Sequence, residues 1–288
     1  MATIIDGKAI SAKVRASIKN EVEALKSRGV TPGLAVIIVG DNAASRVYVN
    51  NKKKACAELG MKSEEYALPG DTTEEALLAL IDELSHRSDI NGILCQLPLP
   101  AHLSEEKVIA AIPPEKDVDA FHVTNVGRIM LGDYHFLPCT PAGVMELLDS
   151  TGFPVEGKHC VVIGRSNIVG KPMAMLMLHR NATVTICHSR TANLKELCRQ
   201  ADILVVAIGR ARFVGADMVK PGAVVIDVGM NRPADGKLCG DVDYDAVEPI
   251  ASAITPVPGG VGPMTIAMLM RNTLTAAKMQ NGIEDSAE

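Results

Sequence analysis

Two side chains that could take part in proton transfer stand four residues apart early in the chain. Tyr48 and Lys52 would share one face of a helix, because residues at this spacing are neighbours on a helical surface. A lysine can act as a general base only if burial or a nearby cation lowers the pKa of its ammonium group. Lys52 also begins the run Lys52-Lys53-Lys54, and such a run is ordinarily a solvated face. The spacing alone leaves both interpretations open.

A glutamine and two aspartates follow apolar segments in the first half of the chain. Gln96 comes directly after an apolar strand and before two prolines, at the strand end where open α/β sheets bind ligands. Asp117 and Asp119 are two residues apart and would lie on one side of an extended chain. A purely structural role is the alternative explanation in both cases. Gln96 could cap its loop, and the aspartates could form salt bridges to Lys116 or His122.

A strand, a glycine turn and a helix are predicted in succession around Val161–Gly170. β-branched residues precede Gly164, and an apolar run of helical length follows the turn. Such an entry binds the pyrophosphate of a dinucleotide, because glycine lets the backbone approach and the helix N-terminus offers free N–H groups and about half a positive charge. The spacing is degenerate, since Ser166 and Val169 replace the second and third glycines of the usual pattern and Gly170 comes one residue late.

The tip of the next strand, Cys187–Thr191, carries no carboxylate that would bind the ribose hydroxyls of NAD. The hydroxyl of Ser189 and the guanidinium of Arg190 lie there instead, and Arg165 follows the first glycine of the turn. Arginine binds phosphate bidentately, so this pattern favours NADP as the cofactor. Two solvated arginines are the alternative explanation.

These residues fall at the ends of strands in two successive series of alternating strands and helices. The fold class predicted is therefore α/β, with two domains that each contain a parallel sheet. Strands are expected at Leu34–Val39, Lys62–Leu68, Ile90–Leu97, Cys160–Ile163, Thr183–Cys187, Ile203–Ile208 and Val224–Val228. Helices are expected at Ala9–Lys26, Ala43–Leu59, from a Thr72 or Thr73 cap to about His86, and at Ser104–Ile112, Pro141–Leu148, Pro172–His179, Asn193–Gln200 and Met264–Met279. Pro113–Pro138 and Thr255–Pro263 are expected to be irregular.

The composition narrows the class of protein. The 288 residues carry a net charge of −5, no tryptophan and 3% aromatic residues, which argues against nucleic acid as a partner. No apolar stretch approaches the roughly 18 residues of a membrane span, and the N-terminus lacks a signal core, so we expect no membrane association. The seven cysteines form no C-x-x-C pair and predict reduced thiols in a cytoplasmic protein. The seven histidines show no metal-ligand spacing, so no metal is assigned.

Five motifs in order resemble one family, the bifunctional methylenetetrahydrofolate dehydrogenase/methenyltetrahydrofolate cyclohydrolases. They are Tyr48-Val-Asn-Asn-Lys52, Gln96-Leu-Pro-Leu-Pro100, Lys116-Asp-Val-Asp119, Gly164-Arg-Ser-Asn-Ile-Val-Gly170 and Pro256-Val-Pro-Gly-Gly-Val-Gly-Pro-Met-Thr265. The resemblance covers nearly the whole chain. It implies a folate-binding catalytic domain (1–139 and 264–288), a Rossmann-like NADP-binding domain (140–263) and an active-site cleft between them. It also implies a homodimer that pairs through the cofactor domain.

The resemblance assigns roles to individual residues. Lys52 looks like the catalytic lysine, Tyr48 its neighbour in the folate site, Gln96 the residue that supports the lysine, and Asp119 the carboxylate that holds the pterin. The expected substrate-binding set is Tyr48, Lys52, Gln96, Leu97, Pro98, Asp119, Gly262 and Pro263, and the expected cofactor-binding set is Gly164, Arg165, Ser166, Ser189 and Met230. Ala120 stands where glycine is common in the family, and alanine disfavours a positive φ.

The activity that the resemblance implies has two steps. The first is NADP-dependent oxidation of 5,10-methylenetetrahydrofolate to 5,10-methenyltetrahydrofolate, in which a nitrogen lone pair of the substrate expels hydride and the enzyme supplies placement. The second is hydrolysis to 10-formyltetrahydrofolate, which needs a base for water and an acid for the leaving nitrogen. Lys52 could serve in that step if the cationic substrate lowers its pKa.

Two other functions remain open from the sequence. One is a different two-domain NADP-dependent dehydrogenase, similar to shikimate dehydrogenase, which should lack Gln96 before its two prolines. The other is a non-catalytic NADP-binding regulator, and the presence of Lys52, Gln96 and Asp119 argues against it.

Overall fold

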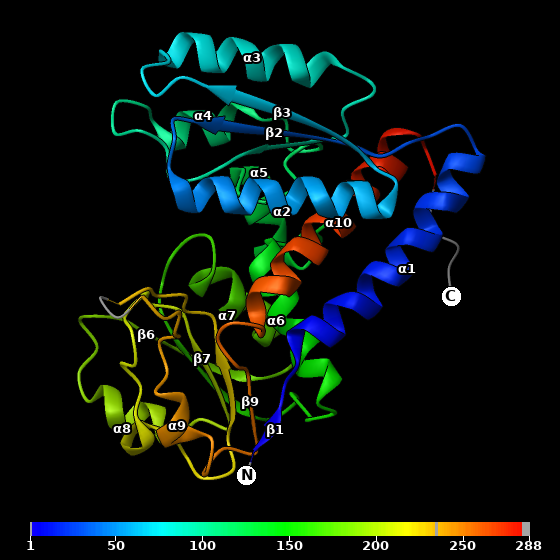
Figure 1. Ribbon diagram of the computed structural model, residues 1–288. Coiled ribbons are helices and arrows are strands. Elements are labelled where there is room, and N and C mark those ends of the chain that lie inside the picture. The colour runs from blue at the N-terminus through cyan, green and yellow to red at the C-terminus, as the bar shows by residue number, and fades with distance from the viewer. Residues whose placement is uncertain (1, 234–235, 284–288) are drawn as a thin grey trace. The chain divides into compact units, whose positions relative to one another are not determined.

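The computed structural model describes residues 2–233 and 236–283, which form two compact α/β units (Figure 1). Unit 1 comprises Met1–Ala12 and Thr140–Thr265, and unit 2 comprises Lys13–Cys139 and Ile266–Glu288. The divisions fall within helix α1 (Gly7–Ser27), at the start of α6 (Cys139–Ser150) and within α10 (Val261–Gln280). Among the described residues, no helix combines the length and the apolar character that a membrane crossing requires.

Unit 2 contains a three-stranded parallel sheet in the order β3-β2-β4, formed by Lys62–Leu68, Gly33–Val39 and Gly92–Cys95. The central strand β2 is buried along its whole length, as its continuous apolar run predicts for a strand with both faces covered. Helix α2 (Ala43–Leu59) covers one face and α3 (Glu74–His86) the other (Figure 1). Asn42 caps α2 by accepting from the amide of Ser45, and Thr73 caps α3.

The segment after β4 was expected to be loop-rich, and the structure departs from that expectation in part. Helix α4 (Glu105–Ala111) leads to a parallel bridge between Ile93 and Asp117, which brings the aspartate motif alongside β4. Helix α5 (Val123–Leu131) then occupies part of the predicted loop. The prediction of a loop was wrong here, because the helix is short and the Pro- and Asp-containing segments on either side of it favoured an irregular assignment.

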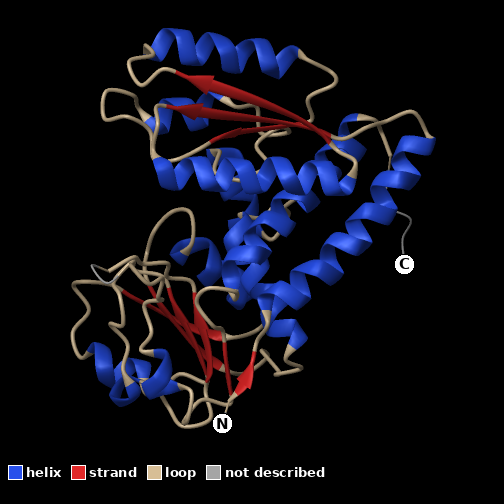
Figure 2. Ribbon diagram, viewed as in Figure 1, coloured by secondary structure: helices blue, strands red, loops and turns tan. Residues whose placement is uncertain are grey.

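Unit 1 contains a six-stranded parallel sheet in the order β1-β9-β8-β7-β5-β6 (Figure 2). The strands are Thr3–Ile4, Ala253–Ile254, Val224–Asp227, Ile203–Val206, His159–Ile163 and Thr183–Cys187. The two-residue strands β1 and β9 gave no pattern in the sequence. Because β1 pairs with β9, the first residues of the chain belong to this sheet by backbone pairing, whereas the sequence grouped them with residues up to 139.

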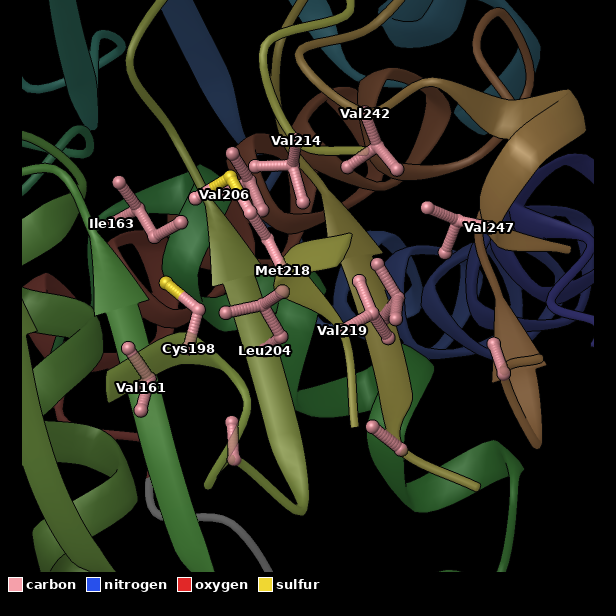
Figure 3. Close-up of a cluster of buried hydrophobic side chains, with 14 of the residues drawn as sticks. Val161, Ile163, Cys198, Leu204, Val206, Val214, Met218, Val219, Val242 and Val247 are labelled. Atoms are coloured by element: carbon pink, nitrogen blue, oxygen red, sulfur yellow. The ribbon is translucent and has the colours of Figure 1, made fainter. Parts of the chain in front are cut away.

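Apolar side chains from unit 1's sheet form a buried cluster with its short helices (Figure 3). Val161 of β5 and Leu204 and Val206 of β7 pack with Cys198 of α8 (Leu194–Cys198) and Met218 of the 3-10 helix Ala216–Met218. The remaining helices of the unit are α7 (Gly170–His179) and α9 (Tyr244–Val247). Burial of this cluster fixes the strands, so the loops at their carboxyl ends start from defined positions.

The proline- and glycine-rich segment before α10 is shorter than the sequence predicted. Helix α10 begins at Val261 rather than Met264, because proline is tolerated in the first turn of a helix. A Cβ built on Gly7 would lie 1.8 Å from the carbonyl oxygen of Gly260, and the amide of Lys8 donates to the carbonyl of Gly259 at 3.1 Å. Close packing against Gly260 therefore explains the glycine at position 7, whereas Gly260 is required because its own Cβ would lie 2.7 Å from the carbonyl oxygen of Pro256.

Candidate active site

The ammonium group of Lys52 is buried on α2 and bonded to the end of a strand. Lys52 is 9% exposed, and its Nζ donates to Oε1 of Gln96 at 2.9 Å. The backbone amide of Gln96 donates to the carbonyl of Ile37 in β2, which places Gln96 between β2 and β4, where the strand order of the sheet reverses. Ligands of open α/β sheets bind at such points. Nε2 of Gln96 donates to the carbonyl of Leu97 at 2.8 Å, so Oε1 is the atom turned toward the lysine.

The structure separates Lys52 from the two lysines beside it. Lys53 and Lys54 are exposed, so the interpretation as a solvated face holds for them and not for Lys52. Burial lowers the pKa of Lys52, while the negative charge of Asp119 acts to raise it. A lowered pKa is what a general base needs near neutral pH.

Asp119 lies close enough to Lys52 for each charge to affect the other. Burial raises the pKa of the Asp119 carboxyl, and Lys52 and the Cys139 thiol oppose that rise. Sγ of Cys139 donates to Oδ1 of Asp119 at 3.4 Å, and burial raises the pKa of Cys139 so far that it remains a thiol. Asn272 of α10 donates to the carbonyls of Val118 and Leu137 at 2.8 Å each. Sequence reasoning did not identify Cys139 or Asn272, since their partners are a carboxylate and two carbonyls that are distant in the chain.

The neighbouring Asp117 has a structural role. It accepts hydrogen bonds from the backbone amide of His122 at 2.8 Å and from Nδ2 of Asn125 at 2.9 Å. Lys116 donates its ammonium protons to the carbonyl of Arg87 at 2.6 Å, so the salt bridges offered as an alternative are absent from the described residues. Ala120, directly after Asp119, is buried with a φ of 58°, the left-handed conformation that its side chain disfavours.

The other predicted folate-binding residues are divided between the two units. Leu97 and Asp119 line one mainly apolar cavity of unit 2, and the Leu97–Pro98 peptide bond is cis. Tyr48 lies on α2 one turn before Lys52 and is 37% exposed, and burial raises the pKa of its phenol. Gly262 and Pro263 lie in the first turn of α10, within unit 1.

The glycine turn of unit 1 lies between β5 and β7, where the strand order of that sheet reverses. A Cβ on Gly164, whose φ is 131°, would lie 2.3 Å from the carbonyl oxygen of Ala207. A Cβ on Gly170 would lie 2.2 Å from the carbonyl oxygen of Gly164. Only glycine fits at these two positions, so the degenerate motif still builds the tight turn.

The donors around this turn fit an anionic dinucleotide, but the available amides precede α7 instead of lying at its first residues, as the sequence had suggested. Oγ of Ser166 accepts from the amides of Val169 and Gly170 at 3.1 and 3.3 Å, so the first amides of α7 are already paired. The amides of residues 165–168 have no acceptor in the part of the chain that the structure describes. The side chains of Arg165 and Arg190 are exposed on the turn and on the loop after β6. The residues present are therefore suited to NADP.

Met230 and Gly262 lie side by side within unit 1. A Cβ on Gly262 would lie 3.3 Å from Cε of Met230, which is 45% exposed. One of these residues was expected in the cofactor site and the other in the folate site. Ser189 is exposed in the loop after β6. Across residues 2–233 and 236–283, no group of three or more His, Cys, Asp or Glu side chains could hold a metal ion.

Comparison with known proteins identifies the family. The model of the tetrahydrofolate dehydrogenase/cyclohydrolase catalytic domain matches residues 5–119, and the model of the NAD(P)-binding domain of the same family matches residues 138–281. The chain belongs to the tetrahydrofolate dehydrogenase/cyclohydrolase family. A curated relative, the bifunctional protein FolD of Ruminiclostridium cellulolyticum, is 62% identical over 98% of this chain and 99% of its own length.

Solved structures of the family share the whole fold. The bifunctional FolD methylenetetrahydrofolate dehydrogenase/cyclohydrolase of Campylobacter jejuni has a TM-score of 0.95 at 51% identity, over 97% of this chain and 99% of that one. The Trypanosoma brucei enzyme, solved with NADP and an inhibitor, has a TM-score of 0.93 at 39% identity, over 96% of this chain and 98% of that one. Shikimate dehydrogenase from Thermus thermophilus, at 16% identity and a TM-score of 0.52, shares the fold alone.

Membership of the tetrahydrofolate dehydrogenase/cyclohydrolase family establishes the two activities. The chain is an oxidoreductase and a hydrolase of folate one-carbon metabolism that uses NADP. Its unit 1 has the Rossmann-like architecture predicted for the cofactor domain. The prediction of the family from five motifs is confirmed.

Proposed function

We propose that Lys52 is the acid–base catalyst of the cyclohydrolase step and that Gln96 holds it in place. The observation that carries this proposal is the 2.9 Å hydrogen bond from a buried lysine to a neutral amide. As the free amine, Lys52 takes a proton from water while the oxygen adds to the methenyl carbon. As the ammonium, it returns that proton to N5 when the bond between N5 and that carbon breaks, while the proton of the added hydroxyl leaves to solvent as its oxygen becomes the carbonyl of the formyl group on N10.

Asp119 and Tyr48 complete the catalytic set in this proposal. Asp119 accepts hydrogen bonds from the aminopyrimidine of the pterin, and its charge acts on Lys52 within the same site. Tyr48 lies one turn from Lys52 on α2 and lines the folate site. We assign Leu97, Pro98, Gly262 and Pro263 to the folate-binding set as well.

The dehydrogenase step needs placement rather than a proton acceptor from the chain, since a substrate nitrogen drives the loss of hydride. NADP supplies the hydride acceptor. Gly164, Arg165, Ser166, Ser189 and Met230 are the residues we assign to holding the cofactor, with Arg165 pairing with its extra phosphate. Exposed arginines and the absence of a carboxylate from the strand tip support that assignment.

We further propose residues 1–139 and 264–288 as the folate-binding domain and 140–263 as the NADP-binding domain, with the amino-terminal strand completing the cofactor sheet. A homodimer would pair through this domain, which the outer position of β6 and its exposed Ile186 support. Seven free cysteines support a cytoplasmic location. Sedimentation of the purified protein tests the dimer.

An assay with 5,10-methylenetetrahydrofolate and NADP tests the function directly when NADPH and the methenyl product are followed separately. We expect NADPH to form while the methenyl product is consumed. NADPH formation with a stable methenyl product would contradict the cyclohydrolase assignment. Equal turnover with NAD would contradict the cofactor assignment.

A further inference from the structure

Two buried carboxylates in unit 1 take no part in the reaction described above. Asp227 is the last residue of β8 and is 3% exposed, and Asp241 is fully buried in the segment that precedes α9. Within residues 2–233 and 236–283, neither carboxylate has a lysine, arginine or histidine as an ion-pair partner. Buried carboxylates without cations are costly unless hydrogen bonds satisfy them, so their donors show what they do.

The side chain of Asp241 accepts hydrogen bonds from the backbone of the loop that follows β7. Its Oδ2 accepts from the backbone amides of Ile208 and Gly209 at 2.7 and 2.9 Å. Its Oδ1 accepts from the amide of Arg210 at 2.7 Å and from Nδ2 of Asn231 at 2.8 Å. Three successive backbone amides that point toward one anion form the concave anion site known as a nest. The turn needs a residue with positive φ, and Gly209, with a φ of 65°, supplies it.

Asp227 in turn holds the backbone around Asp241. Its Oδ1 accepts from the amides of Gly229 and Asp241, and its Oδ2 accepts from the amide of Val242, each at 2.9 Å. The two carboxylates therefore act in series, since Asp227 fixes the backbone that presents the side chain of Asp241. A Cβ on Gly240 would lie 1.8 Å from Oδ2 of Asp227, so the chain here is packed against the carboxylate.

The loops held in this way lie at the carboxyl ends of β7 and β8, the edge of the sheet where α/β proteins bind their ligands. The loop after β8 contains Met230, one of the residues assigned to the cofactor. We propose that Asp241 and Asp227 are positioning residues of the dehydrogenase step, which hold the backbone at 208–210 and 229–231 in the shape that receives NADP. This inference rests on the proposed function, because it takes the cofactor to bind at this edge.

The two activities of the chain allow a test with an internal reference. In Asp241→Asn, the amide nitrogen that replaces one oxygen cannot accept, so part of the four-donor set loses its partner. The loops would then relax, and the KM for NADP should rise about tenfold, the ratio that corresponds to about 1.4 kcal/mol. Hydrolysis of added methenyltetrahydrofolate needs no NADP, so its kcat and KM should stay within about twofold of the wild type.

A matched control lies two residues away. Asp243 is half-buried, and its side chain makes no capping hydrogen bond to α9. The substitution Asp243→Asn therefore makes the same chemical change in the same segment without removing such a bond. We expect its KM for NADP to be unchanged. Equal loss of both activities in Asp241→Asn, or an unchanged KM for NADP in the folded variant, would overturn the proposal.

If Asp241→Asn does not fold, Asn231→Ala tests the positioning role instead. This substitution removes one donor to Asp241 and leaves both carboxylates in place. We expect a threefold rise in the KM for NADP with cyclohydrolase activity preserved, and no rise would refute the positioning role. Failure of the proposed cofactor site would look different, since Arg165→Ala would then leave the preference for NADP over NAD unchanged, whatever the KM for NADP of Asp241→Asn.

Discussion

The ammonium group of Lys52 is bonded to the side-chain oxygen of Gln96, and the carbonyl of Leu97 fixes the orientation of that amide. A neutral acceptor orients the amine without adding a negative charge that would hold its proton. Burial lowers the pKa of Lys52, and the more distant charge of Asp119 opposes this shift. The pair therefore combines a fixed direction with a titratable base.

Replacement of this amide by a carboxylate should trap the lysine as the ammonium. In Gln96→Glu, an adjacent negative charge raises the pKa of Lys52, and each unit of increase removes about 90% of the free amine at a pH below the pKa. We expect cyclohydrolase activity at neutral pH to fall about tenfold or more and its pH profile to move upward. The profile of kcat against pH measures this, and an unmoved profile would show that Gln96 does not act through Lys52.

Lys52→Met should separate the two reactions. The substitution keeps an apolar stem of similar length and removes the amine, and a positioned acid–base group contributes about 10²–10⁴-fold to rate. Cyclohydrolase activity should therefore be nearly abolished, while dehydrogenase activity survives in part and the methenyl product accumulates. Lys54→Met on the same helix is the control, because Lys54 is exposed. Complete loss of both activities in a folded Lys52→Met protein would instead make Lys52 a residue that places the substrate for both steps.

Asp119→Asn should impair both reactions while leaving the cofactor untouched. The amide keeps the shape of the side chain but loses the charge that accepts from the aminopyrimidine and from the thiol of Cys139. We expect the KM for the folate substrate to rise and both turnover rates to fall, with NADP binding preserved. Steady-state kinetics with each substrate varied in turn measure this. Unchanged folate affinity and turnover would remove Asp119 from the site.

Arg165→Ala should reduce the discrimination between NADP and NAD. Loss of a guanidinium that pairs with a phosphate costs roughly 2–3 kcal/mol, on the order of a hundredfold in affinity. NAD lacks that phosphate, so its binding should change little. Arg199→Ala, an exposed arginine at the end of α8, is the control. An unaltered ratio of kcat/KM for the two cofactors would show that Arg165 is not the residue that recognises the phosphate.

The long, capped elements were predictable from the sequence, because their patterns are local. The helix that carries Lys52 has a clear cap and stop, and the strand before Gly164 ends in three β-branched residues, Val161, Val162 and Ile163. The strands β1 and β9, with two residues each, are defined only by their pairing with each other and with β8. A short stretch of sequence therefore cannot identify either strand.

The site was predictable only in part, for a similar reason. The sequence could not distinguish Lys52 from Lys53 and Lys54 by composition, since burial separates them and the motif alone selected the first. Cys139 and Asn272 serve the site through partners far away in the chain. Asp227 and Asp241 escaped notice because their partners are mainly backbone amides, which any residue type supplies.

The buried carboxyl of Asp227 should leave a signature in the pH dependence of stability. Burial, reinforced by the negative charge of Asp241, raises the pKa of Asp227 to about 7 from an ordinary value of 3.8, against the opposing backbone hydrogen bonds. Between these two pH values the folded protein binds more protons at this group than the unfolded chain does. The free energy of unfolding therefore falls as the pH rises from about 4 to 7, by about 4 kcal/mol from this group.

Asp227→Asn removes that titration. The variant loses part of the acceptor set and should be less stable than the wild type at pH 5, but the deficit should shrink as the pH rises to 8, because only the wild type acquires the buried charge. Urea unfolding at several pH values measures the difference, provided that the m-value stays constant. In Asp243→Asn the difference from the wild type should show no such trend between these pH values. A deficit in Asp227→Asn that is the same at pH 5 and pH 8 would mean that Asp227 is already ionised at pH 5 in the folded protein.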